Sequence, residues 1–141
     1  MTSLSLLRKK ALFKFMYWSV RIGLGLTFIS SGLRKLPGEK FTILSIDNPI
    51  GAYFNAMYET GIYWNFIGYF QIVIGILVFF NRFVVLCSLL MMPVTINIFL
   101  VSVGLHMRGT PIITSMMVVG NIFLMLWHYE NYRTVLQRPI R

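Results

Sequence analysis

The chain has 141 residues, a formal net charge of +9 and a single cysteine, Cys87. Only 12% of its residues are charged and 57% are hydrophobic, whereas a soluble domain carries about 25% charged residues. This deficit excludes an ordinary soluble protein, and the length suits one domain over residues 1–141. One cysteine cannot form an intramolecular disulfide, so redox chemistry with paired cysteines is also excluded.

The first apolar segment covers about residues 15–36 and follows a basic start. At 1.5 Å per residue it is about 33 Å long, which is enough to span a bilayer. No A-x-A-like cleavage site follows it, so we expect an uncleaved span. Arg21, Gly25, Gly32 and Lys35 recur at helical spacing on one face, and the glycines on that face predict close packing against another helix.

The only long connection covers about residues 38–61. Asn48 is a suitable N-cap and Pro49 a suitable first helical residue. Apolar residues then recur at helical spacing up to Tyr58, and Gly61 is a natural stop. This pattern predicts a short amphipathic helix that lies on the outer membrane surface or, alternatively, closes the bundle like a lid.

Three further spans are predicted at about residues 63–80, 83–105 and 112–129. Gly68 and Gly75 share a face of the second span, and Pro93 interrupts the backbone hydrogen bonds of the third. Because the turns between the spans are short, the predicted fold is an all-α integral membrane protein with an up-down-up-down bundle of four transmembrane helices.

Basic residues are unevenly divided between the two predicted faces of the membrane. The inner face has Arg8, Lys9, Lys10, Lys14, Arg82, Arg133, Arg138 and Arg141, and the outer face has Arg34, Lys35, Lys40 and Arg108. Lys and Arg collect on the cytoplasmic side of membrane proteins. We therefore expect a bacterial inner (plasma) membrane protein with both termini in the cytoplasm, and we see no nucleic-acid motif.

Three amide side chains fall at similar depth in three different spans: Gln71, Asn97 and Asn121. If they converge, they form an interior polar layer that can hydrogen-bond the carbonyl oxygens of a lipid-soluble ligand such as a quinone. The alternative is that they only bind neighbouring helices together, as interhelical amides often do.

No catalytic or metal site is predicted from the titratable residues. His106 and His128 fall at opposite membrane faces, so they cannot share a metal ion or clamp one haem. No carboxylate falls at mid-membrane, which argues against a proton pump. No serine has a histidine at matching depth, so no nucleophile–base pair is indicated.

Several motifs resemble the DoxX family over about residues 15–133: RIGLGLTFISSGLRKL in the first helix, FQIVIGILVFFNR and MMPVTINIFL with LHMRGTP in the second and third, and NIFLMLWHYENY in the fourth. The resemblance implies a small four-helix bacterial inner-membrane protein linked to redox metabolism, since the family is named for a subunit of a thiosulfate:quinone oxidoreductase. Many members carry a glutamate where this chain has Gln71, so a proton-coupled role of that acid is not implied here.

The residues and the resemblance together favour a redox-associated membrane subunit that binds a quinone in the polar layer. One alternative is a non-catalytic anchor or interaction subunit of a larger complex, which would contact a membrane or periplasmic redox partner through the glycine faces or the segment 38–61. A second alternative is a transporter of a small lipophile, which would have to form a homo-oligomer because four spans are few for one chain.

Overall fold

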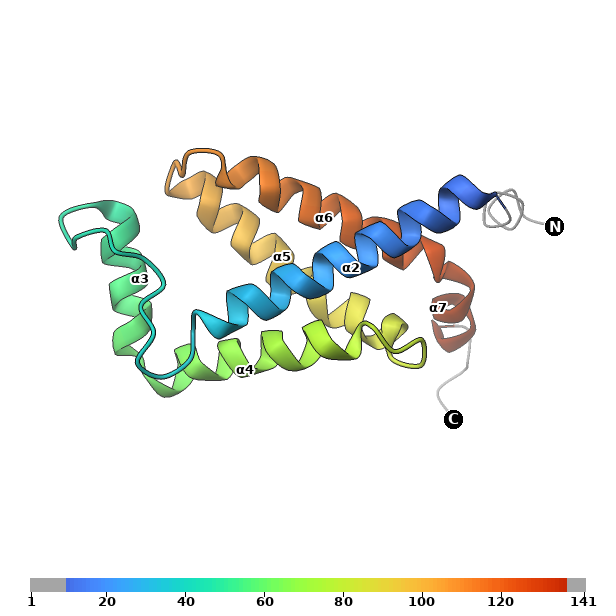
Figure 1. The fold of residues 1–141 in the computed structure, drawn as a ribbon, viewed down its shortest axis with the longest axis horizontal. Coiled ribbons are helices and arrows are strands. Elements are labelled where there is room, and N and C mark those ends of the chain that lie inside the picture. The colour runs from blue at the N-terminus through green and yellow to red at the C-terminus, as the bar shows by residue number, and fades with distance from the viewer. Residues whose placement is uncertain (1–9, 137–141) are drawn as a thin grey trace.

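The computed structural model describes residues 10–136, and in this part of the chain the regular secondary structure is all α-helix (Figure 1). The helices are α2 (Ala11–Leu33), α3 (Pro49–Glu59), α4 (Ile62–Leu77), α5 (Val84–Gly104), α6 (Thr110–Trp127) and α7 (Tyr129–Leu136). The prediction of an all-α protein is therefore confirmed. Four basic residues used to predict the orientation, Arg8, Lys9, Arg138 and Arg141, lie outside the described residues.

Three helices of the described chain, α2, α5 and α6, are each long and apolar enough to cross a membrane. Helices α3 and α4 form a pair bent by 95°, and the number of spans rises to four if this pair counts as one. Large apolar side chains face outward on every bundle helix, for example Leu26 (55% exposed), Phe66 (63%) and Leu100 (60%). An outward surface of this kind suits lipid contact, so the chain is a membrane protein.

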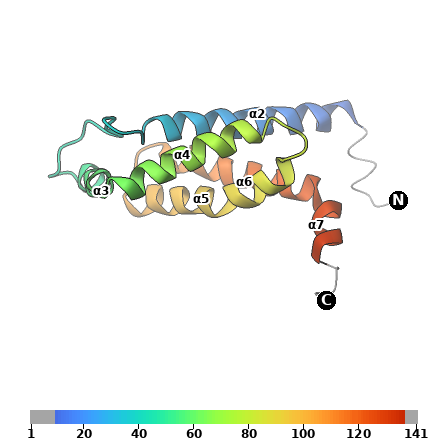
Figure 2. The same ribbon diagram turned by 90° about the horizontal axis from the view of Figure 1, so that it is seen from below.

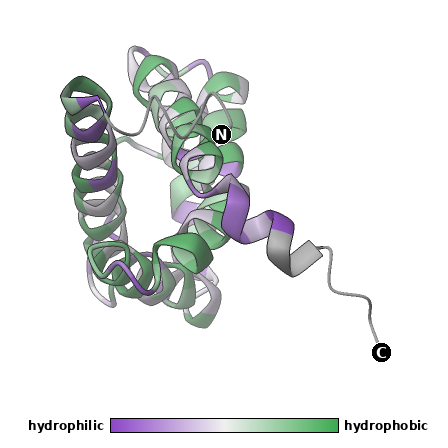
Figure 3. Cartoon of the chain, turned by 90° about the vertical axis from the view of Figure 1, so that its right-hand side faces the viewer, coloured by the Kyte–Doolittle hydropathy of each residue, from purple (hydrophilic) through white to green (hydrophobic). Residues whose placement is uncertain are grey.

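The helix ends differ from the predicted span ends by a few residues. Helix α2 ends at Leu33, three residues before the predicted end, and leaves Lys35 in the turn that follows. Pro37 disfavours helical backbone at the residue before it, and Gly38 adopts a φ of +85°. The short helix α7 was not predicted separately; it begins after the break at His128, and Figure 3 shows it as a hydrophilic projection from an otherwise largely hydrophobic bundle.

Helix α3 begins as its sequence predicts. The Asn48 side-chain oxygen accepts a hydrogen bond from the backbone N–H of Ile50 at 2.9 Å, and Pro49 occupies the first turn. Gly61 takes a φ of +57° between α3 and α4. A positive φ is easily adopted by glycine and lets the chain change direction sharply there, so α3 lies across the end of α4 (Figures 1 and 2).

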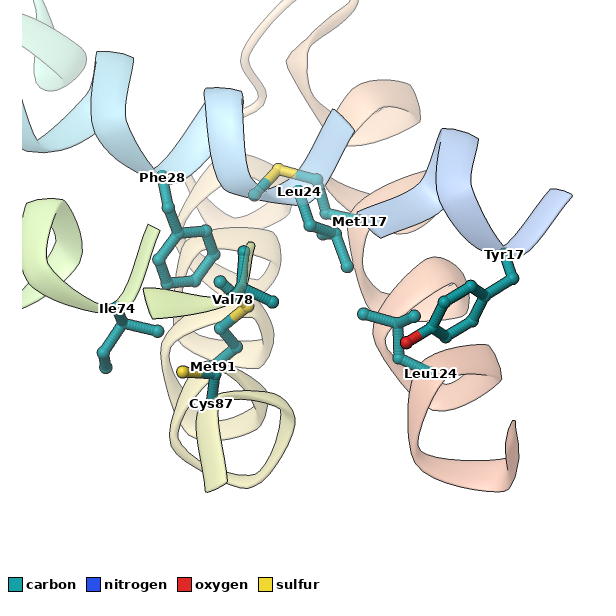
Figure 4. Close-up of a cluster of buried hydrophobic side chains, with 9 residues drawn as sticks. All are labelled: Tyr17, Leu24, Phe28, Ile74, Val78, Cys87, Met91, Met117 and Leu124. Atoms are coloured by element: carbon teal, nitrogen blue, oxygen red, sulfur yellow. The ribbon is translucent and has the colours of Figure 1, made fainter. Parts of the chain in front are cut away.

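The bundle helices do not pack equally against one another. Helix α2 packs along α4 and also contacts α6, α5 packs along α6, and α4 and α5 touch only over a short stretch. The buried core lies where these helices meet and includes Leu24 and Phe28 of α2, Val78 after α4, and Met91 of α5 (Figure 4). The sparse contact between α4 and α5 leaves room on that side of the bundle.

Glycines bring α2 and α4 into backbone contact. A methyl group at Gly32 would lie 2.6 Å from the carbonyl oxygen of Gly68, and one at Gly75 would lie 2.9 Å from the carbonyl oxygen of Gly25. Carbon and oxygen cannot approach this closely without displacing a helix. The two pairs, Gly25 with Gly75 and Gly32 with Gly68, form a seam that we call the glycine seam. It fixes the position of the end of α2 relative to α4.

Candidate functional site

A cavity of about 480 Å³ lies between α4 and α5, two helices that contact each other sparsely. Its walls are Tyr63, Trp64, Phe66, Ile67, Phe70 and Gln71 of α4, and Pro93, Val94, Asn97, Ile98, Val101 and Ser102 of α5. Ligand pockets typically measure about 300–1,000 Å³ and are mostly apolar with a few polar groups. The cavity has the size and the composition of a site for a small lipophile.

Aromatic side chains hold α3 and the preceding loop over one end of this cavity. The ring of Phe41 stacks on that of Phe54 with 4.3 Å between centroids. Both rings also lie near Trp64, with centroid distances of 5.9 Å and 6.1 Å. Since Phe41, Tyr53 and Phe54 all line the cavity, α3 covers its end, in keeping with the alternative in which this helix acts as a lid.

A hydrogen-bonded chain of polar side chains lies at the α2 side of the cavity. The Lys35 Nζ donates to the Ser31 carbonyl oxygen at 2.9 Å and to the Ser31 Oγ at 2.6 Å. The Ser31 Oγ in turn donates to the Gln71 Oε1 at 3.4 Å. The glycine seam makes this possible, because Gly32 and Gly68 bring the two helices together next to these residues.

Lys35 is a buried cation, only 5% exposed. Its Nζ lies 4.7 Å from the ring centre of Phe41 and 5.1 Å from that of Trp64, which are favourable cation–π positions. The residue lies beyond the end of the α2 span, and burial lowers the pKa of its ammonium to about 8. An ammonium held this way provides positive charge and a hydrogen-bond donor at the rim of an apolar cavity.

Two side chains of the cavity wall each carry a fully buried donor that has no hydrogen-bond partner among residues 10–136: the Gln71 Nε2 and the Trp64 Nε1. Both side chains are buried. An unpaired buried donor costs about 1–3 kcal/mol, and a ligand that supplies an acceptor would recover that free energy. Of the residues singled out from sequence, Gln71 is the one that combines such a donor with a place in the cavity.

The structure brings two of the three predicted amides to the same site. Asn97 lines the cavity wall opposite Gln71. Asn121 is fully buried but does not line the cavity, and its Nδ2 donates to the Met92 Sδ at 3.4 Å. Helix α6 packs against α2 and α5, so Asn121 contacts Met92 of α5, while Asn97 lies in the wall that α5 shares with α4. The expected three-amide layer is therefore a two-amide cavity.

Arg21 lies at the C-terminal end of α4 and has a structural role there. It is fully buried, and its guanidinium donates from Nε to the Val78 carbonyl oxygen at 2.6 Å and from Nη1 to the Asn81 Oδ1 at 2.6 Å. It also lies 4.7 Å from the ring centre of Trp18. Carbonyl groups at a helix C-terminus lack partners within the helix, so Arg21 caps α4 and orders the turn to α5.

Sequence reasoning did not identify Trp64, Phe41 or Ser31 as site residues. A tryptophan at the start of a span is typical of the membrane interface, and nothing in the sequence distinguishes that position from one in a cavity wall. A serine inside a helix often bonds back to a carbonyl oxygen of its own helix, whereas the Ser31 side chain bridges to Gln71 of α4. Among the described residues no group of three His, Cys, Asp or Glu could hold a metal ion.

The structure therefore defines a helical membrane protein with a lipophile-sized cavity that carries hydrogen-bond donors at one end. The family model described as DoxX matches residues 17–105, more than half of the chain. The chain belongs to the DoxX family. No curated protein and no solved structure gives a significant match to it.

Proposed function

We propose that this DoxX-family protein is a redox-associated membrane subunit that binds a quinone in the cavity between α4 and α5. The observation that carries the proposal is the combination of an apolar cavity of about 480 Å³ with unpaired donors at one end of it. A quinone has the matching shape and chemistry, since it joins an apolar tail to a head group with two carbonyl acceptors. When bound, it would supply two-electron redox chemistry that this chain's own side chains lack.

The lining suggests how the ligand is oriented. The head group fits beside Lys35, Gln71 and Trp64, where the donors gather. The tail fits between the apolar walls, along Phe70 of α4 and Ile98 of α5. Asn97 provides a second amide that can bind the head group from the α5 wall.

We place the cavity in a four-span topology with both termini in the cytoplasm of a bacterium and α3 on the outer side of the inner membrane. Helix α4 has 16 residues and a length of about 24 Å, which is less than the roughly 30 Å of a typical hydrocarbon core. Its aromatic ends and the adjoining turns complete the fourth span. The excess of Lys and Arg in the turns and tails assigned to the cytoplasm supports this orientation.

For the alternative of an interaction subunit, two contact surfaces were expected, and one of them, the glycine faces, is used inside the bundle. The glycine faces of α2 and α4 pack against each other through the pairs Gly25–Gly75 and Gly32–Gly68, so they do not offer a docking face to a partner. The segment 38–61 remains for that role. An interaction subunit of this kind needs no ligand in the cavity, so the experiment below distinguishes the two functions.

The test fills the cavity with a side chain and measures bound quinone. Ile98→Trp places an indole in the cavity, while Leu100→Trp places it on the same helix at a side chain that faces outward and is 60% exposed. Protein purified in mild detergent is extracted with organic solvent, and quinone is quantified by chromatography and mass spectrometry. We expect near-stoichiometric quinone in the native protein and Leu100→Trp and little in Ile98→Trp. Background quinone in all three proteins would contradict the proposal and favour the interaction subunit.

A further inference from the structure

The hydrogen-bond chain at the end of the cavity has a direction. An ammonium has donors and no acceptor, so the Lys35 Nζ must donate to the Ser31 Oγ, 2.6 Å away. The Ser31 hydroxyl then directs its own hydrogen to the Gln71 Oε1, at 3.4 Å. The carbonyl oxygen of Gln71 thereby accepts one hydrogen bond and keeps one free lone pair, while the N–H groups of the amide have no partner among the described residues.

Trp64 adds a second group that can only donate. Its indole N–H has no acceptor function, no partner among the described residues, and a position in the wall of the same cavity. The Lys35 Nζ lies 5.1 Å from the centre of the tryptophan ring. Lys35, Gln71 and Trp64 therefore form a donor cluster, a name we use below for these three side chains.

We propose that the donor cluster selects a head group with hydrogen-bond acceptors and no donors, so that the oxidised dione form of a quinone binds more tightly than the reduced diol. The inference rests on the proposed quinone function and adds a preference for one oxidation state. A dione oxygen can accept from the free N–H groups. A hydroxyl of the diol brings an O–H for which the cluster has only the remaining lone pair of the Gln71 Oε1, and a buried donor left without a partner lowers affinity.

The Ser31 hydroxyl is a positioning group in this scheme. It does not have to touch the ligand, but it holds the amide of Gln71 with the N–H groups free. Without it the broad terminal torsion of glutamine lets the amide present its oxygen to the cavity instead. Removal of the hydroxyl should therefore reduce the discrimination between dione and diol more than it reduces total binding.

The test compares the affinities of decylubiquinone and decylubiquinol for the native protein in mild detergent by isothermal titration calorimetry, under anaerobic conditions for the diol. We expect the dione to bind about tenfold more tightly, which corresponds to about 1.4 kcal/mol. Equal affinities, or a tighter diol, would overturn the inference while leaving the quinone function intact. Binding of neither compound would overturn the quinone function itself.

Matched variants separate the positioning role from a loss of folding. Ser31→Ala should bring the dione-to-diol affinity ratio close to one, whereas Ser30→Ala, at an exposed neighbouring residue, should keep the native ratio. Trp64→Phe keeps the aromatic ring and removes only the N–H, so it should lower the ratio severalfold. Trp18→Phe, at a tryptophan that does not line the cavity, serves as its control. A native ratio in both Ser31→Ala and Trp64→Phe would overturn the inference, and circular dichroism checks that each variant is folded.

The carboxylate decanoate provides a second acceptor-only head group on an apolar chain. Binding of decanoate that is weakened by Trp64→Phe, together with no binding of decylubiquinone, would support the acceptor-only selection and contradict the quinone function. The acceptor-only selection and the quinone function can therefore be refuted separately.

Discussion

The glycine seam makes a quantitative prediction about the stability of the bundle. In Gly32→Ala the new methyl group would lie 2.6 Å from the carbonyl oxygen of Gly68 and 2.7 Å from the Cγ1 of Ile72. The contact with Gly68 is with backbone, which cannot rotate away as a side chain can. Helices α2 and α4 must therefore separate, and overpacking of this kind costs about 1–3 kcal/mol.

Gly23 provides a matched control in the same helix. A methyl group there would meet no atom within 4 Å. Glycine in a helix is about 1 kcal/mol less favourable than alanine, so Gly23→Ala should leave the protein as stable as the native chain or slightly more stable. Because both substitutions remove a glycine from α2, the gain in helix propensity largely cancels between them. The difference between the two variants therefore reports the helix contact alone, and we expect it to be about 2 kcal/mol.

The assay is reversible unfolding of each protein by sodium dodecyl sulfate in mixed micelles, followed by circular dichroism. We expect Gly32→Ala to unfold at a lower mole fraction of the denaturing detergent than Gly23→Ala. Gly32→Ala should also bind less quinone, because separation of the helices moves Ser31 and Lys35 away from Gln71. Equal unfolding free energies for the two variants, or a more stable Gly32→Ala, would refute the assignment of the seam.

Three further substitutions test other parts of the structure. Asn97→Leu should leave the bundle folded by circular dichroism and lower quinone occupancy in solvent extracts severalfold; full occupancy would remove Asn97 from the site. Since the pKa of Lys35 is lowered to about 8, its ammonium loses a proton as the pH rises through about 8, so dione affinity should fall over that range in the native protein. Affinity should be independent of pH in Lys35→Met, and the same decline in this variant would exclude Lys35 as its cause. Arg21→Met removes three charge-assisted hydrogen bonds, to Val78, Tyr17 and Asn81, and should cost about 3 kcal/mol in the detergent-unfolding assay. Arg82→Met, at an exposed residue, should change stability negligibly, and equal effects would exclude the capping role of Arg21.

Helical periodicity was enough to predict helices α2 to α6 and one packing face. Gly25 and Gly32 are separated by seven residues, as are Gly68 and Gly75, and seven residues are close to two helical turns. Such spacing places each pair on one face whatever the neighbouring helix is. The start of α3 was predictable for a similar reason, since the Asn48 cap depends on local geometry alone.

The residues that form the site were harder to predict from the sequence than the helices. Depth in the membrane follows from position along a span, and it predicted that Gln71 and Asn97 lie at the same level; both line the cavity. Rotation about the helix axis depends on which helices pack together. Depth alone could therefore not separate Asn97, in the cavity wall, from Asn121, which is fully buried and donates to Met92. Trp64 was missed because a tryptophan at a membrane interface and one in a cavity wall have the same local sequence pattern.

Photolabelling with an azido-quinone tests the central claim most directly. The protein in mild detergent is irradiated with the probe, with and without excess decylubiquinone, and labelled peptides are identified by mass spectrometry. Binding between α4 and α5 predicts labels within residues 63–71 and 93–102 that the competitor suppresses. Labels spread over the outward faces of α2 and α6 and unaffected by the competitor would contradict a quinone site in this cavity.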